Sequence, residues 1–374
     1  MVYVLAVVTL QCLQIKAQLH VSSSDYDSLR QRCHECRATL KLLAQLVELS
    51  DGFRDIDKLI AVKSYKQATL LLATVCDILT DINAAHGNDL AIFPSLVRKQ
   101  TMLKDDLEKC VMHRWKEMVN WSGSPAMLTV VCGSDAHQEL QQLSQSLYNL
   151  GCLSSVIAKL ASQVMVQFVN RLLTDSDTSC DIDIKHGTSS LSLQVVATVT
   201  PATQPAVVRT MRTLELFTAV METLYENLLN INVSEEVSAA RNAARDNVAV
   251  TKDIRDGTCA ENNSSSTSLM SVFGKQCSAA CLEALISHCL SSAIPSHRSE
   301  LAQFSQVAAA VEDLQMKLVM FGFISEDNKV IVDYMKNIDV LFTNKRCVEL
   351  LDEARKLIKS DIHNIIQVTT TDLY

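Results

Sequence analysis

The chain has 374 residues and a formal net charge of -8, without a basic stripe, so direct nucleic-acid binding, which depends on neutralising phosphates, is not expected. Its 9 Gly and 5 Pro residues are about 4% of the chain, where average usage is about 12%, so turns are few and elements long. Hydrophobic residues make up 48% but aromatic residues only 5%, which is typical of helical packing. The composition predicts an all-α protein.

The N-terminal residues 1–18 form an atypical apolar segment. Its run Val2–Leu10 resembles the core of a secretory signal, but no Lys or Arg precedes it and no A-x-A site follows it. The 13 cysteines are an odd number in a chain too long to need disulfide staples, which favours a reducing cytosol. We therefore expect a cytoplasmic protein, with a secreted helical protein as an alternative.

Residues 19–123 are predicted to form a coiled-coil segment and helical hairpins. Apolar residues recur near its start at alternating intervals of four and three, which is the spacing of a coiled-coil seam. The residues of this seam are Leu29, Cys33, Cys36, Leu40, Leu43 and Val47. We expect the seam to pack against another helix, from the same chain or from a partner, and Ser50-Asp51-Gly52 to end its helix.

The middle of the chain is predicted to continue as antiparallel helices. Pro94 suits the first turn of a long helix that should end between Trp121 and Pro125. Residues 124–232 should then form a helical bundle, with a helix stop at Gly151. Alternating apolar residues around the His186-Gly187 turn predict a small β-hairpin near 181–199. Residues 233–268 are rich in Ser, Asn and charge and are predicted to be a flexible linker.

Residues 269–374 are predicted to form a last helical bundle, with helices at 269–290, 298–321 and 329–341. The stretch from Asn337 to Asn364 is predicted to be a helix-turn-helix. One of its faces has the apolar spacing of a helix core. The residues of that face are Cys347, Leu351, Ala354, Ile358, Ile362 and Ile365.

Two cysteine clusters could carry chemistry. Cys33-His34-Glu35-Cys36 contains a C-x-x-C pattern, but both cysteines occupy seam positions, so packing is favoured over metal binding. Cys277, Cys281, Leu285 and His288 are predicted to share one helical face, which favours a buried face over a thiolate site. A cysteine-dependent enzyme that uses Cys281 and His288 remains the other alternative. Without a recognisable catalytic motif, we expect no enzyme, no cofactor and no metal.

The residues near the C-terminus resemble the segment that closes the N-terminal half of Zeste-white 10 proteins. They are Phe342, Asn344, Lys345, Cys347, Ala354, Arg355, Leu357, Ser360, Ile362, His363 and Asn364. Further stretches are similar to the same family, in the same order. These are Leu19-His20-Val21, the Trp115 and Trp121 pair, and Ala293-Ile294-Pro295-Ser296.

This resemblance implies an elongated rod of antiparallel helical bundles, of the helical-rod tether type. It implies a non-enzymatic adaptor with two settings. At kinetochores the partners would be Rod, Zwilch and dynein-dynactin, in support of the spindle checkpoint. At the endoplasmic reticulum the chain would tether Golgi-derived vesicles with a second helical subunit, contacting membrane only peripherally. Family members continue beyond the point that matches Tyr374, so the resemblance implies a truncated form.

The polar residues of the last segment have two interpretations. Arg355, His363 and Asn364 could form a polar site, or a solvated face with local hydrogen bonds at a helix end. The resemblance favours a joint to a further domain. The predicted joint residues are Phe342, Asn344, Lys345, Cys347, Arg355, Ile362, His363 and Asn364.

Overall fold

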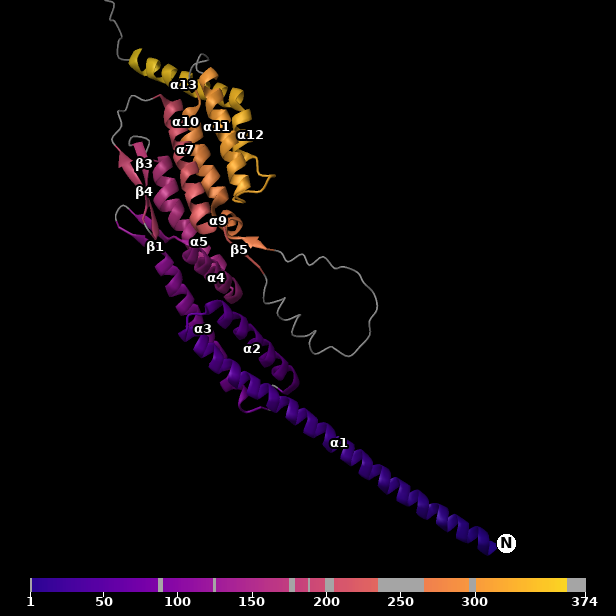
Figure 1. Cartoon of the computed structure of the whole chain (residues 1–374). Coiled ribbons are helices and arrows are strands. Elements are labelled where there is room, and N and C mark those ends of the chain that lie inside the picture. Colours follow the sequence, from indigo (N-terminus) through magenta and orange to yellow (C-terminus); the bar gives the residue numbers. More distant parts are fainter. Residues whose placement is uncertain are drawn as a thin grey trace, which may run out of the picture. The chain divides into compact units, whose positions relative to one another are not determined.

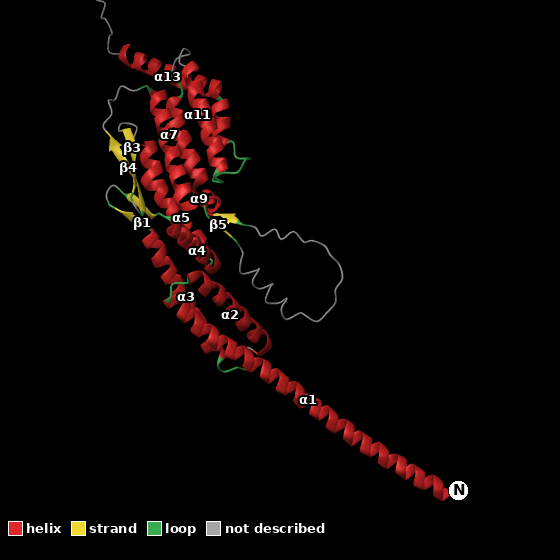
Figure 2. Ribbon diagram, in the orientation of Figure 1, coloured by secondary structure: helices red, strands yellow, loops and turns green. Residues whose placement is uncertain are grey.

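The computed structural model describes residues 2–86, 90–123, 126–174, 179–187, 189–198, 205–234, 266–295 and 301–361. Helices dominate these residues, and a small four-stranded and a two-stranded antiparallel sheet are inserted among them, which confirms the predicted fold class (Figure 1, Figure 2). The chain divides into two compact units, residues 1–110 and 111–374. The boundary lies inside helix α3 (Phe93–Met118).

The first unit is built on an antiparallel helix pair. Helix α1 (Val2–Ala61) turns at residues 62–64 into α2 (Tyr65–His86). Lys63 adopts a left-handed backbone conformation with φ 63°, and the Ser64 amide donates to the Leu59 carbonyl at 2.9 Å. This hydrogen bond satisfies one of the carbonyls left open at a helix end.

The predicted helix end at Ser50-Asp51-Gly52 is wrong, because α1 continues without a break to Ala61. Gly52 is buried against α2, and a Cβ at this position would lie 2.9 Å from Val75 Cγ2. The glycine therefore allows a close approach of two helices. Leu49 and Ile56 of α1 are fully buried on the same side.

Helix α3 begins at Phe93 with Pro94 in its first turn, as predicted. It joins both neighbours in the first unit: Lys99 Nζ lies 3.4 Å from Asp57 Oδ2 of α1, and Gln100 Nε2 donates to Cys76 Sγ of α2 at 3.1 Å. Its expected end between Trp121 and Pro125 is too late, because the chain turns into a strand after Met118.

The second unit contains a four-stranded antiparallel sheet of order β1-β2-β4-β3. Strands β3 (Ser179–His186) and β4 (Ser190–Thr198) form the predicted hairpin. Strands β1 (Val119–Ser122) and β2 (Met127–Val131) extend it and were not predicted. Trp121 is thus a strand residue, and its ring packs 5.2 Å from that of Phe168.

The remaining helices form the bundle of the second unit. Helix α4 (Ser134–Leu150) ends at Gly151, which has a φ of 77°, as predicted. Among the described residues, three helices contain a π-helical turn, named η1 to η3. The elements are α4 (Ser134–Leu150), α5 (Leu153–Val164), η1 (Met165–Val169), α6 (Asn170–Thr174), α7 (Ala206–Leu224), η2 (Tyr225–Leu229), β5 (Asn232–Val233), β6 (Thr267–Ser268), α9 (Leu269–Ala284), η3 (Leu285–Leu290), α10 (Ser291–Ala293), α11 (Leu301–Met320), α12 (Val330–Lys336) and α13 (Ile338–Asp361).

Close packing holds this bundle together. Helix α5 packs along α9, and α7 packs along α11, where Lys317 Nζ lies 3.0 Å from Glu222 Oε1. Gly274 of α9 is in contact with the segment after α11, since a Cβ there would lie 2.0 Å from the Phe323 carbonyl oxygen. Glycine at this position lets the two backbones meet.

The last helix begins at a different residue and has a different course from its prediction. Residues 338–361 form a single helix, so the expected helix-turn-helix is wrong, and the chain breaks earlier, at Asn337 between α12 and α13. Most of the predicted linker 233–268 lies outside the described residues. Its two ends are described and pair as β5 and β6.

Candidate partner-binding surfaces

Helix α1 carries apolar side chains on two opposite faces. One face includes Ala38, Leu42 and Leu49 and packs toward α2. The other face is the α1 seam, which we define as Leu29, Cys33, Cys36, Leu40, Leu43 and Val47. At about 100° per residue, seam residue Leu40 points roughly 200° away from Leu42. Contact with α2 therefore leaves the seam uncovered.

All six residues of the α1 seam are exposed. Leu29, Leu40, Leu43 and Val47 have 59%, 66%, 52% and 61% of their surface accessible. Such a row of large apolar side chains is characteristic of an interaction surface. Within the part of the chain that the structure describes, no helix of the same chain covers it. Figure 1 shows α1 continuing well past the end of α2.

The sequence prediction omitted three basic residues beside the α1 seam. Arg30, Arg32 and Arg37 are exposed, and none forms an ion pair with a described residue. Counted in the heptad of the seam, they occupy flanking e and g positions, which set partner choice in coiled coils. Heptad positions could have identified them from the sequence.

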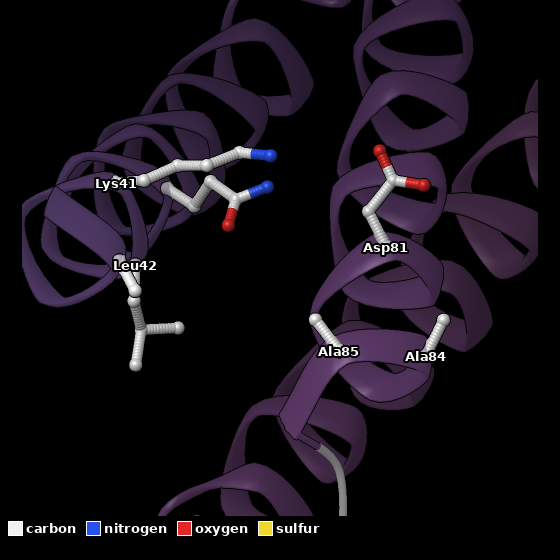
Figure 3. A pocket seen from close by; sticks show the side chains of 7 residues that line it. Lys41, Leu42, Asp81, Ala84 and Ala85 are labelled. Atoms are coloured by element: carbon white, nitrogen blue, oxygen red, sulfur yellow. The ribbon is translucent and has the colours of Figure 1, made fainter. Parts of the chain in front are cut away.

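A groove of about 560 Å³ lies where α1 and α2 diverge. Lys41 on α1 and Asp81 on α2 project toward it from opposite walls, above Leu42, Ala84 and Ala85 (Figure 3). The groove therefore combines an apolar lining with one charge of each sign. Sequence reasoning missed it, because its two walls are brought together only by the turn at residues 62–64.

The C-x-x-C motif lies on the exposed side of α1. Cys33, His34 and Cys36 are all exposed, and the two cysteines belong to the seam. Across the described residues, no group of three His, Cys, Asp or Glu side chains is placed to hold a metal ion. The motif thus contributes two thiols to an apolar surface.

The second cysteine cluster is arranged differently from its prediction. Cys277 and Cys281 are buried, but His288 is exposed, so the predicted shared face is wrong for the histidine. The reason is the π-helical turn η3, which holds an extra residue and places Cys289 on the buried face instead. Burial raises the pKa of Cys277 and Cys289 to about 12, and it also raises the pKa of Cys281. Since the thiolate is the nucleophile, this environment opposes the cysteine-enzyme alternative.

The predicted joint residues lie on different sides of α13. Phe342 and Lys345 are half-buried, whereas Asn344, Cys347 and Arg355 are exposed. Lys345 Nζ donates a hydrogen bond to the Ile294 carbonyl oxygen, and Arg355 Nη1 lies 3.0 Å from Asp352 Oδ1. Ile362, His363 and Asn364 lie outside the described residues, so the structure does not place them beside Arg355.

The predicted core face of α13 is wrong, because its described members are exposed. Leu351 and Ile358 have 57% and 63% of their surface accessible, and Cys347 and Ala354 are also exposed. The side of α13 that packs instead carries Leu341, Phe342, Lys345, Arg346 and Glu349. Apolar spacing alone does not reveal which of two helix faces meets the bundle.

Two helical segments, Tyr65–Ala85 and Leu269–Ala293, are apolar and long enough to cross a membrane by length and composition, and a bent pair, Ser134–Leu150 with Leu153–Leu173, could count as a third. This search covers the described residues. In the structure α2 packs along α1, and α9 packs along α5. Protein therefore covers part of both apolar segments.

Comparison with known proteins identifies the family. Residues 103–358, more than half of the chain, match the family described as the middle domain of the centromere/kinetochore protein zw10. The chain belongs to the Zw10 family. This confirms the resemblance found in the sequence. The Zw10 match includes the hydrogen-bonded Lys345 and Ile294, whereas the α1 seam lies before it.

Similar proteins are found in two rodents. The centromere/kinetochore protein zw10 homolog of Rattus norvegicus is 24% identical over 371 residues, which cover 95% of this chain and 44% of the rat protein. The homolog of Mus musculus is 22% identical over 372 residues, with the same shares. The Zw10-family chain thus spans less than half the length of these relatives.

Proposed function

We propose that this Zw10-family chain is a non-enzymatic scaffold whose α1 seam binds a helix of a partner protein. It would act in the two cellular complexes that the resemblance to Zw10 proteins implies. One is the kinetochore complex with Rod and Zwilch, which recruits dynein-dynactin for the mitotic checkpoint. The other is a peripheral tether for Golgi-derived vesicles at the endoplasmic reticulum. The chain would be cytoplasmic and would reach both sites through its partners.

The observation that carries this proposal is the pair of opposite apolar faces on α1. Burying a large aliphatic side chain contributes about 1.5–3 kcal/mol, so four exposed aliphatic residues in one row represent a large unused stabilisation. Their four-and-three spacing is that of coiled-coil positions, which interlock with a second helix. A helical partner therefore fits the seam better than an irregular segment does.

A second exposed surface, on α13 of the other unit, supports a scaffold role. The first turns of α13 are attached to the bundle through Phe342 and Lys345, while its later residues 350–359 are all exposed and include Leu351, Leu357 and Ile358. We propose that this exposed half is a joint to a further domain. The Arg355 side of the helix would then contribute polar contacts at the rim.

The experiment is affinity purification of the chain from mitotic and interphase cells, scored for Rod, Zwilch, dynactin and vesicle-tether subunits. The test variant is Leu40→Asp/Leu43→Asp, which places two charges in the seam. The matched control is Val97→Asp/Met102→Asp on α3, where the two side chains are 37% and 56% exposed. We expect the seam variant to lose its helical partner while the control retains it.

Circular dichroism of both variants separates lost binding from lost structure, because the seam residues are exposed and their replacement should preserve helix content. Retention of every partner by a correctly folded seam variant would refute the role of the seam. The identity of the subunits lost in mitosis and in interphase distinguishes the kinetochore setting from the tethering setting.

A further inference from the structure

The charges beside the α1 seam restrict what kind of helix can bind there. The seam repeats as a and d positions, with Leu29, Cys36 and Leu43 at d, and Cys33, Leu40 and Val47 at a. Arg30 and Arg37 then occupy e positions, and Arg32 occupies a g position. All three are exposed, so the central part of the seam has a basic residue on each side.

A second copy of α1 is a poor occupant for this surface. In a parallel pair, a g residue of one helix meets the following e residue of the other, which places Arg32 opposite Arg37 and Asp25 opposite Arg30. In an antiparallel pair that aligns Cys33 with Cys36, the e positions face each other, which places Arg30 opposite Arg37. The parallel pair therefore gains no net attraction between its flanking charges, and the antiparallel pair juxtaposes like charges, which disfavours it.

The two cysteines weaken self-pairing further. Cys33 and Cys36 are smaller than the leucines that usually fill a and d positions, so two copies of α1 would pack thiols against thiols at the centre of the seam. A partner helix with large aliphatic residues there would fill this space. The small size of Cys33 and Cys36 and the excess of arginines at the flanking positions therefore favour a helix of another protein over a second copy of α1.

We infer that the occupant of the α1 seam is an amphipathic helix of another protein, with large aliphatic residues at its core positions and Asp or Glu at its flanking positions. Arg30, Arg32 and Arg37 select this helix. The inference rests on the proposed function, since it specifies the partner of the same surface. Acidic flanks would pair with all three arginines, and each guanidinium can bind a carboxylate through two hydrogen bonds.

The probe is a labelled synthetic helix of about four heptads with Leu at its core positions and Glu at every flanking position. A second peptide carries Lys at the flanking positions. Fluorescence anisotropy with the full chain should give a dissociation constant at least about tenfold lower for the Glu peptide, and added salt should reduce the difference.

The charge-reversal variant is Arg30→Glu/Arg32→Glu/Arg37→Glu, and it should reverse the preference between the two peptides. The matched control, Lys104→Glu/Lys116→Glu/Lys275→Glu, makes the same change in net charge at three exposed positions outside α1 and should keep the preference. Equal affinity of the wild-type chain for both peptides would overturn the acidic-helix inference.

Two further results distinguish this inference from the proposed function. If Leu40→Asp/Leu43→Asp loses its cellular partners but the unaltered chain binds both peptides equally, the seam is a docking surface and only the acidic selection is wrong. If the chain dimerises through α1, mild oxidation should link Cys33 or Cys36 between two copies. If such a disulfide-linked dimer formed, and if Leu40→Asp/Leu43→Asp abolished it, the inference that the α1 seam binds a helix of another protein would be wrong.

Discussion

The ammonium group of Lys345 on α13 donates a hydrogen bond to the main-chain carbonyl of Ile294, 51 residues earlier in the chain. Ile294 follows α10, at a bend where the carbonyl has left the helical hydrogen-bond pattern. The side chain of Lys345 is half-buried, so the bond is partly shielded from water. It connects the start of α13 to the end of the α9–α10 segment.

Replacing Lys345 with Met should loosen the first turns of α13. The substitution keeps an unbranched stem but removes the donor to Ile294, and loss of a charged hydrogen bond costs about 1.5–3 kcal/mol. Hydrogen exchange of residues 338–349 should therefore become faster. Arg355→Met, which removes an exposed ion pair with Asp352, should leave that exchange unchanged. Equal protection in both variants would contradict a structural role for Lys345.

Replacing Gly274 with Ala should strongly destabilise the second unit. The added Cβ would lie 2.0 Å from the Phe323 carbonyl oxygen, and backbone cannot move aside as a flexible side chain can. We expect a loss of about 3 kcal/mol or more in the free energy of unfolding, measured by urea denaturation. Lys275→Ala, at the adjacent exposed position, serves as the control. A Gly274→Ala chain as stable as that control would refute the close contact.

Replacing Gly52 with Leu should separate α1 from α2. Even a Cβ at this position lies 2.9 Å from Val75 Cγ2, and the larger side chain has no space between the helices. Overpacking of this kind costs about 1–3 kcal/mol, which exceeds the gain of roughly 1 kcal/mol from removing a helical glycine. Denaturation followed by circular dichroism should show the loss. Ser50→Leu, at an exposed position nearby, should show none.

The buried thiols should make stability decrease in alkali. Burial raises the pKa of Cys277 and Cys289 from 9.0 to about 12. Between these values the unfolded chain releases thiol protons that the folded chain retains, so the free energy of unfolding falls as pH rises. The slope is about 1.4 kcal/mol per pH unit for each such thiol.

Urea titrations between pH 9 and 11 measure this slope, which should be smaller in a Cys277→Ala/Cys289→Ala variant. Thiol labelling at neutral pH gives an independent measurement. Cys33, Cys36 and Cys347 are exposed and should react in the native state, whereas Cys277, Cys281 and Cys289 should react only after unfolding. Rapid native labelling of Cys281 would contradict its burial and revive a reactive-thiol role.

Local sequence signals predicted several features correctly, and each has a local cause. Pro94 opens α3 because its fixed φ suits a first turn, and Gly151 ends α4 because it adopts the left-handed conformation. The His186-Gly187 hairpin follows from alternating side chains on its two strands. Strands β1 and β2 are only four and five residues long, so β1 was included in the predicted Pro94 helix and β2 fell unrecognised within the predicted bundle 124–232.

Apolar periodicity by itself indicated helix over the α1 seam and over residues 347–358 of α13 and showed which residues share a face, but it did not give the ends of either helix. Only the tertiary structure decided which face is covered. On α1, the contact with α2 leaves Leu40 and Leu43 exposed. On α13, Phe342 and Lys345 are half-buried against the bundle, whereas Leu351 is exposed. The physical reason is that hydrophobic burial depends on what other elements reach a surface, and the spacing of side chains along one helix contains no record of those distant neighbours.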